Sequence, residues 1–235
     1  MRLDLRRIAK TVLAASIFAV ACSPSWVSAF EGVISFKSNY WGESSEFQYS
    51  TKEGRSRIDT RRVRHGRAAV IMDLEALKVS MLLLNVRLAM VMNLDASALL
   101  RPASTDRGLV RTGKRKIVLG YPAEQRLHSG EEEDVEMWGT TELGIFMGLH
   151  PTSSMFGRRG GAPAWERAMI EQKLFPLIVI RKDKKGQEIG RLEAIGIEHK
   201  VIPDSLFEIP RWYLTYDKFD PKNKVPGMPG TVWVK

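Results

Sequence analysis

The feature that most constrains the fold of this chain is a series of short segments in which apolar and polar residues alternate. In the first of them, Phe30, Ile34 and Phe36 fall on one side, and Glu31 and Lys37 fall on the other. A period of two residues is typical of a β-strand with one buried face. Short polar turns separate each segment from the next. The pattern predicts a mainly β protein with a few helices, built largely from hairpins.

The alternation also predicts where the elements lie. Strands are expected at 30–37, 46–52, 55–60, 68–73, 78–84, 88–94, 116–119, 123–128, 135–140, 174–181 and 188–201. Pro163 suits the start of a helix over 164–173, in which Trp165 and Met169 share an apolar face. Residues 95–116 are polar and rich in Arg, so we expect an irregular break there.

The strongest strand signal is in residues 68–94, where three strands joined by tight turns form an antiparallel meander. These strands are apolar on both faces, for example at Met81–Leu84 and at Met90–Met92. Strands of this kind belong to the centre of a sheet that is covered on both sides. The meander is therefore expected either to be packed on both faces or to cover a ligand on one of them.

The first 29 residues have the pattern of a secretory signal peptide. A basic head with Arg6, Arg7 and Lys10 precedes an uncharged, mostly apolar run over 11–21, and Val27-Ser28-Ala29 has the form of a signal-peptidase site. The apolar run is shorter than the ~20 residues of a membrane-spanning helix. We therefore expect a mature chain that starts at Phe30 and works in the periplasm of a bacterial envelope.

Cys22, the only cysteine of the chain, leaves two routes open. Ala19-Val20-Ala21-Cys22 resembles a lipobox, in which the cysteine is lipidated, and Ser23 then favours the outer membrane. Alternatively, Cys22 is removed with the signal, and the protein is simply secreted into the periplasm. In the second case no thiol remains for a nucleophile, a CxxC redox site or a cysteine zinc site.

The size and charge of the expected mature chain limit its number of domains and the chemical classes of its partners. Residues 30–235 suit one domain of ordinary size, which can build a core without disulfides. The signal segment carries a net +3 of the chain's +9, which leaves +6. Mild basicity suits anionic lipid head groups or an acidic protein, although it also serves solubility alone. Nucleic acid is not expected in this compartment, and we expect a monomer.

Enzyme motifs are missing from the sequence. No HExxH pair and no GxSxG elbow is present, and the four histidines are isolated from one another: His65, His128, His150 and His199. The acidic run Glu131–Asp134 is expected at a hairpin tip rather than at a cation site, and 157–161 as a surface linker. We therefore expect no catalytic site, no metal and no cofactor.

Several short motifs resemble a known family. They are Phe30-Glu31-Gly32-Val33-Ile34, Thr112-Gly113-Lys114 with Gly120-Tyr121, Glu136-Met137-Trp138, and the closing stretch Ile202-Pro203-Asp204-Ser205-Leu206-Phe207-Glu208-Ile209-Pro210. Together they are similar to an uncharacterised family of bacterial envelope domains, a domain of unknown function. More distantly, the chain resembles the lipoprotein carriers LolA and LolB. The resemblance spans residues 30–213 and leaves 214–235 as a Pro-rich tail.

The resemblance implies a strongly curved antiparallel sheet, an unclosed barrel with helices across its concave face. In the carriers, the space between sheet and helices accepts acyl chains. This chain departs from them in its Arg-rich stretch 101–116 and in its Gly-rich stretch near Arg158-Arg159. No single binding residue of the carriers can be aligned with it.

Two groups of residues are candidates for binding. The first is apolar and rich in methionine, whose flexible side chain suits exchangeable contacts as well as ordinary core packing. Its members are Met81, Leu83, Met90, Met92, Phe146, Met147, Met155, Trp165 and Met169. The second is basic and flanks a turn at His65-Gly66, where it would meet lipid head groups or a partner, unless it is only a solvated hairpin end. Its members are Arg61, Arg62, Arg64 and Arg67.

These observations favour a non-catalytic envelope protein that binds or carries a lipid or a lipoprotein acyl chain between sheet and helices. The alternative is a structural or interaction module of the envelope with a packed core and no ligand. A hydrolase with an unrecognised site is a weaker third hypothesis.

Overall fold

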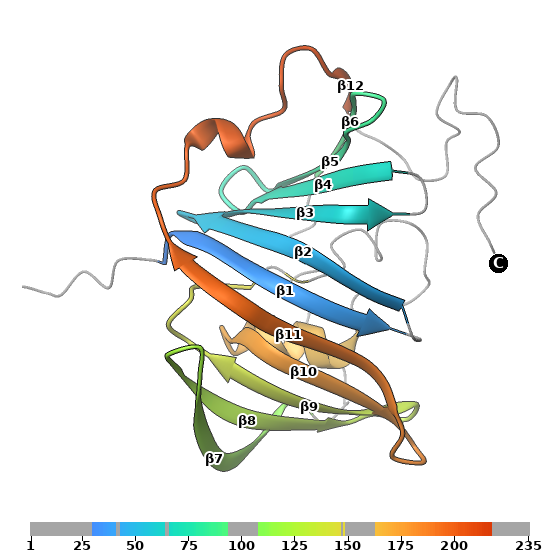
Figure 1. The fold of residues 1–235 in the computed structure, drawn as a ribbon, viewed down its shortest axis with the longest axis vertical. Coiled ribbons are helices and arrows are strands. Elements are labelled where there is room, and N and C mark those ends of the chain that lie inside the picture. Colours follow the sequence, from blue (N-terminus) through green and yellow to red (C-terminus); the bar gives the residue numbers. More distant parts are fainter. Residues whose placement is uncertain are drawn as a thin grey trace, which may run out of the picture.

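The chain forms one twelve-stranded sheet (Figure 1). The structure, a computed structural model, describes residues 30–40, 43–63, 66–93, 108–146, 148 and 163–217. Its strands are β1 (Gly32–Tyr40), β2 (Glu43–Lys52), β3 (Arg55–Val63), β4 (Gly66–Asp73), β5 (Lys78–Leu83), β6 (Leu88–Asn93), β7 (Val110–Val118), β8 (Tyr121–Ser129), β9 (Glu133–Thr140), β10 (Phe175–Asp183), β11 (Glu188–His199) and β12 (Leu214–Asp217).

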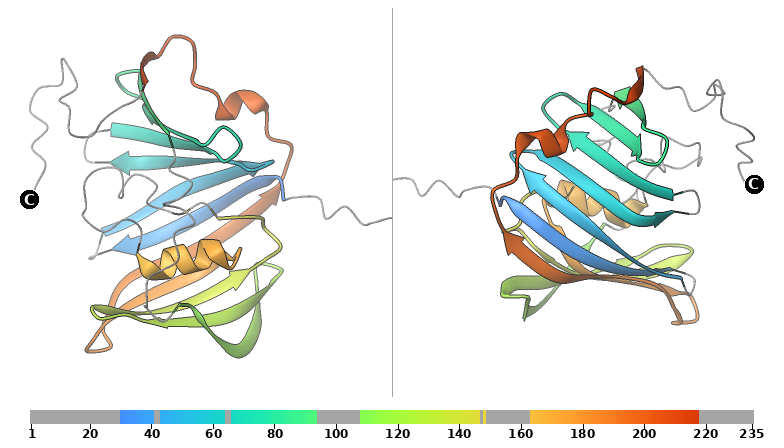
Figure 2. Two further views of the ribbon diagram at one scale, coloured as in Figure 1. Left: turned by 180° about the vertical axis from the view of Figure 1, so that it is seen from behind. Right: turned by 45° about the horizontal axis from the view of Figure 1, so that its top comes forward.

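The strand order is β12-β6-β5-β4-β3-β2-β1-β11-β10-β9-β8-β7. All neighbouring strands are antiparallel except β12, which pairs with β6 in parallel. The chain builds one half of the sheet from β1 outward to β6 and the other half from β7 inward to β11. The two edges, β12 and β7, are not paired with each other, so the curved sheet stays unclosed (Figures 1 and 2). This confirms the expected curved, mainly antiparallel sheet.

One α-helix, α2 (Ala164–Glu171), lies across one face of the sheet, as the left view of Figure 2 shows. We call this the inner face. Pro163 is the residue before the helix, and its carbonyl accepts hydrogen bonds from the amides of Glu166 and Arg167. The helix ends two residues earlier than expected, because Lys173 adopts a positive φ of 53° just beyond it. The described ranges hold only this α-helix and a short 3-10 helix, η1 (Asp204–Phe207), so cover by several helices stays a prediction.

Each face of the sheet has its own apolar core. The inner core joins the central strands to α2 and includes Phe36, Tyr49 and Met169. The outer core lies on the opposite face, where Ile202 and Phe207 pack against residues of β1, β4, β5 and β6. The meander is therefore covered on both faces, as its two-sided apolar pattern predicts.

Two elements differ from expectation. Strand β7 begins at Val110, inside the stretch expected to be irregular, and β12 occupies residues 214–217 of the predicted tail. Almost every side chain of β7 is exposed, so its sequence lacks the alternation by which strands are recognised. Among the described residues, no helix is both long and apolar enough to span a membrane.

Candidate functional site

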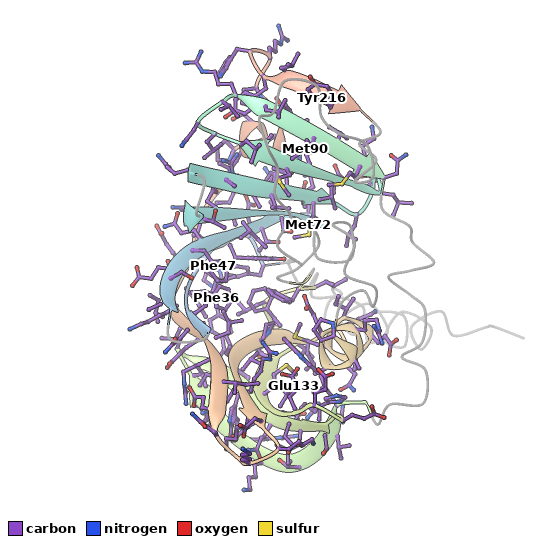
Figure 3. The ribbon with its side chains drawn as sticks, turned by 90° about the vertical axis from the view of Figure 1, so that its right-hand side faces the viewer. Phe36, Phe47, Met72, Met90, Glu133 and Tyr216 are labelled. Carbon is purple, nitrogen blue, oxygen red and sulfur yellow. The ribbon has the colours of Figure 1, made fainter. Side chains whose placement is uncertain are left out.

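The inner face of the meander carries a grid of nine apolar side chains, three from each of β4, β5 and β6. Its cross-strand rows are Ala68, Leu83 and Leu88; Val70, Met81 and Met90; and Met72, Val79 and Met92. Because the last row belongs to the inner core and side chains alternate along a strand, all nine face the same way. We call them the meander surface; Figure 3 labels Met72 and Met90. Four of the nine are predicted ligand contacts.

Burial differs between the rows of the meander surface. The row of Met72, Val79 and Met92 is buried throughout. In the other two rows the β6 residue is buried, whereas Met81 and Leu83 are only half-buried. Methionine side chains can repack around an inserted apolar group. The meander surface therefore combines one buried apolar row with two rows that are more accessible.

Aromatic rings fill the inner core closer to α2. The Phe146 ring stacks on Tyr49 at 5.3 Å between centroids, and it meets Phe175 edge to face at 5.3 Å. On the neighbouring strands, Phe36 stacks on Phe47 at 5.2 Å, and Figure 3 labels this pair. Phe146, a predicted ligand contact, is 1% exposed and thus packs as part of this cluster.

Helix α2 brings an unpaired polar group into this apolar region. Trp165 is 2% exposed, and its indole Nε1–H is the one buried side-chain N–H or oxygen of the described residues without a hydrogen-bond partner. An unsatisfied buried donor costs about 1–3 kcal/mol. By contrast, the indole of Trp138 donates to Glu136 Oε1 at 3.0 Å. The described residues therefore supply no acceptor to the Trp165 indole.

A buried arginine anchors α2 to the sheet. Arg126 on β8 is 2% exposed and donates from Nη2 to Glu124 Oε2 at 2.8 Å and from Nε to Gln172 Oε1 at 3.4 Å. Gln172, just after α2, donates in turn to the carbonyl of Leu109 at 3.0 Å. The hydrogen bond from Arg126 lowers the pKa of Glu124 and outweighs the opposing effect of burial. These polar contacts fix the end of the helix beside β8.

The remaining candidate residues do not form one site: some lie on α2, some on β3 and β4, and some outside the described residues. Trp165 and Met169 lie on α2 in the inner core. Arg67 lies on β4 with an exposed side chain, and Arg61 and Arg62 belong to β3. Outside the described residues lie Cys22, Arg64, Met147 and Met155. Within the described ranges, no group of three His, Cys, Asp or Glu residues is placed to hold a metal ion.

The fold and the meander surface define a class of protein with a large unclosed sheet and an apolar inner face. The model of the family called "Domain of unknown function (DUF4412)" matches residues 30–213. The chain belongs to this family, which confirms the resemblance to an uncharacterised domain.

Solved structures share the fold at low sequence identity. An uncharacterized conserved protein from Thermus thermophilus matches with a TM-score of 0.51 and 8% identity, over 82% of this chain and 93% of that one. PNGF-II matches with a TM-score of 0.50 and 14% identity, over 81% of this chain and 31% of that one. The chain thus spans about a third of PNGF-II.

A structure of MucB in complex with MucA(peri) is a weaker match. Its TM-score is 0.43 at 13% identity, over 79% of this chain and 56% of that one, a score too low to establish a common fold. No curated protein matches the sequence significantly.

Proposed function

We propose that this protein is a non-catalytic component of the bacterial envelope that binds an apolar ligand on its inner face. The ligand is a lipid or the acyl chain of a lipoprotein, held between the sheet and α2. The observation that carries this proposal is the unpaired indole N–H of Trp165, a residue that packs in the apolar inner core. A lipid satisfies both features, because it has an acyl chain and an ester or amide carbonyl that accepts a hydrogen bond.

The meander surface supplies the apolar part of the proposed site. Burial of apolar surface contributes ~25 cal/mol per Å², or about 0.8 kcal/mol for each methylene group. An acyl chain lying along the surface should gain affinity about fourfold with each added methylene. We infer that a ligand enters at Met81 and Leu83, because their side chains are only half-buried.

The expected export of the chain agrees with such a role. A signal peptide over 1–29 would place the mature protein among envelope lipids, and the resemblance to LolA and LolB points to the same ligand class. An acylated Cys22 would fix the protein to a membrane, whereas cleavage after Ala29 would leave it free to diffuse.

The test is a binding titration with lysophosphatidylethanolamines of increasing acyl chain length, each kept below its critical micelle concentration. Affinity should rise with chain length, and Trp165→Phe should lower it about tenfold, which corresponds to the loss of one hydrogen bond. Trp138→Phe is the matched control, because its indole already donates to Glu136. Equal affinities for Trp165→Phe and the wild type would contradict the proposed site.

A second function, that of a structural or interaction module, is favoured by the dense packing around Phe146. In that case the inner face is only core, and the envelope partner binds elsewhere. The same titration separates the two functions, because a packed core binds no lysolipid at any chain length.

A further inference from the structure

Three large apolar side chains lie exposed together where β6 meets β12. Val86 in the β5–β6 turn is 64% exposed, Trp212 is 69% exposed, and Leu214 is 63% exposed. The two chain segments that carry them are joined directly, because the amide of Leu214 donates to the carbonyl of Arg87 at 2.9 Å. Exposed apolar residues that gather at one place mark an interaction surface.

Basic residues surround these side chains. Arg87 lies in the same turn, Arg211 precedes Trp212, and both are exposed. Exposed Arg67 is joined to this turn by two hydrogen bonds, from the Leu84 amide to its carbonyl at 3.0 Å and from its own amide to Asn85 Oδ1 at 3.5 Å. We call the six residues the β12 tip: Arg67, Val86, Arg87, Arg211, Trp212 and Leu214.

Acidic residues are missing from the immediate sequence neighbourhood of the tip residues. The stretches 66–72, 84–92 and 209–216 contain no Asp or Glu. Strand β3 also ends at this side, because Val63 pairs with Gly66, so Arg61 and Arg62 lie near the same end of the sheet. A second copy of the chain is a poor partner, because its tip would bring arginines against arginines.

The β12 tip continues the meander surface to the edge of the sheet. Leu214 is opposite Leu88, which is opposite Leu83, and Tyr216 is opposite Met90. Figure 3 shows Met90 and Tyr216 near one end of the sheet. An apolar path therefore runs from an exposed edge to the inner face.

We propose that the β12 tip docks on a bilayer that contains anionic phospholipid. Trp212, Val86 and Leu214 enter the interfacial region, where tryptophan is favoured, and the arginines contact lipid phosphates. Docking places the β12 edge of the meander surface against the bilayer. An acyl chain then moves between the bilayer and the meander surface without crossing water. This last step rests on the proposed lipid binding, whereas docking itself does not.

Co-sedimentation with vesicles tests the docking. Purified, exported protein should bind vesicles of phosphatidylethanolamine and phosphatidylglycerol, bind phosphatidylcholine vesicles much less, and lose binding as NaCl is raised. Both Trp212→Ala/Leu214→Ser and Arg87→Glu/Arg211→Glu should weaken binding by about tenfold or more. The controls Ile117→Ser, at a site that is 69% exposed on the opposite edge strand, and Lys114→Glu on that strand should bind as the wild type does.

Three results would overturn the proposal: no vesicle binding, equal binding to both vesicle types, or equal losses in the tip and control variants. An envelope protein that binds the tip while vesicles do not would assign the tip to a protein partner and overturn it as well. Lysolipid titration of the same samples tests the proposed function separately. Vesicle binding that depends on the tip, in a protein that binds no lysolipid, would support docking and refute lipid carriage.

Discussion

At the scale of single residues, two buried groups on the inner face differ in how they are satisfied. Arg126 donates to the carboxylate of Glu124 and to the side-chain amide of Gln172, which lies just after α2. Trp165 has a buried donor and no acceptor. A satisfied buried charge indicates a structural role, whereas an unsatisfied buried donor leaves a place for an acceptor such as a water or a ligand.

Arg126 should therefore be important for stability. Arg126→Met should lower the free energy of unfolding by about 2–3 kcal/mol, because it removes charge-assisted hydrogen bonds and leaves the end of α2 without its anchor. The measurement is chemical denaturation followed by circular dichroism. Arg115→Met is the control: Arg115 pairs with the same Glu124 at 2.9 Å, but its side chain is 77% exposed. Its change should stay below about 1 kcal/mol, and equal losses in the two variants would refute the anchor.

None of these residue roles was visible in the sequence. Glu124 and Arg126 both lie on β8, but Gln172 lies just after α2, and only the fold brings it to Arg126. The sequence pattern identified the apolar face of α2 correctly, and hence the burial of Trp165. That the Trp165 indole lacks an acceptor depends on its surroundings, which no local pattern encodes.

At the scale of elements, prediction succeeded where hydrophobic alternation was strong. The strands of the meander and the paired strands β10 and β11 lie close to their expected bounds. β7 was largely missed because an edge strand with four basic residues and few buried side chains has no apolar period. β12 was missed because four residues are too few to show one.

The segment after β9 contributes Phe146 to the inner core, and this packing role can be tested directly. Phe146→Ala should lower the free energy of unfolding by about 3–4 kcal/mol, because it removes a buried ring from contact with Tyr49 and Phe175. Thermal and chemical unfolding measure the change. The neighbouring Ile145 is 44% exposed, so Ile145→Ala should cost less than about 1 kcal/mol. A small loss for Phe146→Ala would mean that the Phe146 ring does not close the inner core beside Tyr49 and Phe175.

At the scale of the whole molecule, the curved sheet has two distinct regions on its inner face. Near α2 the face is closed by stacked rings, and toward β12 it becomes the half-buried meander surface with an exposed apolar edge. The overall architecture could be predicted, because alternation and turns define a sheet and a family resemblance gave its curvature. The cross-strand rows of the meander surface could not be predicted, because they depend on strand register. Their continuation to the edge of the sheet depends on the parallel pairing of β12 with β6.

Lipid binding on the inner face is tested best by native mass spectrometry of protein purified from its own organism. We expect a bound species heavier than the chain, which releases a phospholipid or an acylated molecule on denaturation. Trp165→Phe should lower the occupied fraction, and Trp138→Phe should not. Protein that is consistently empty, in wild type and variants alike, would contradict lipid binding on the inner face.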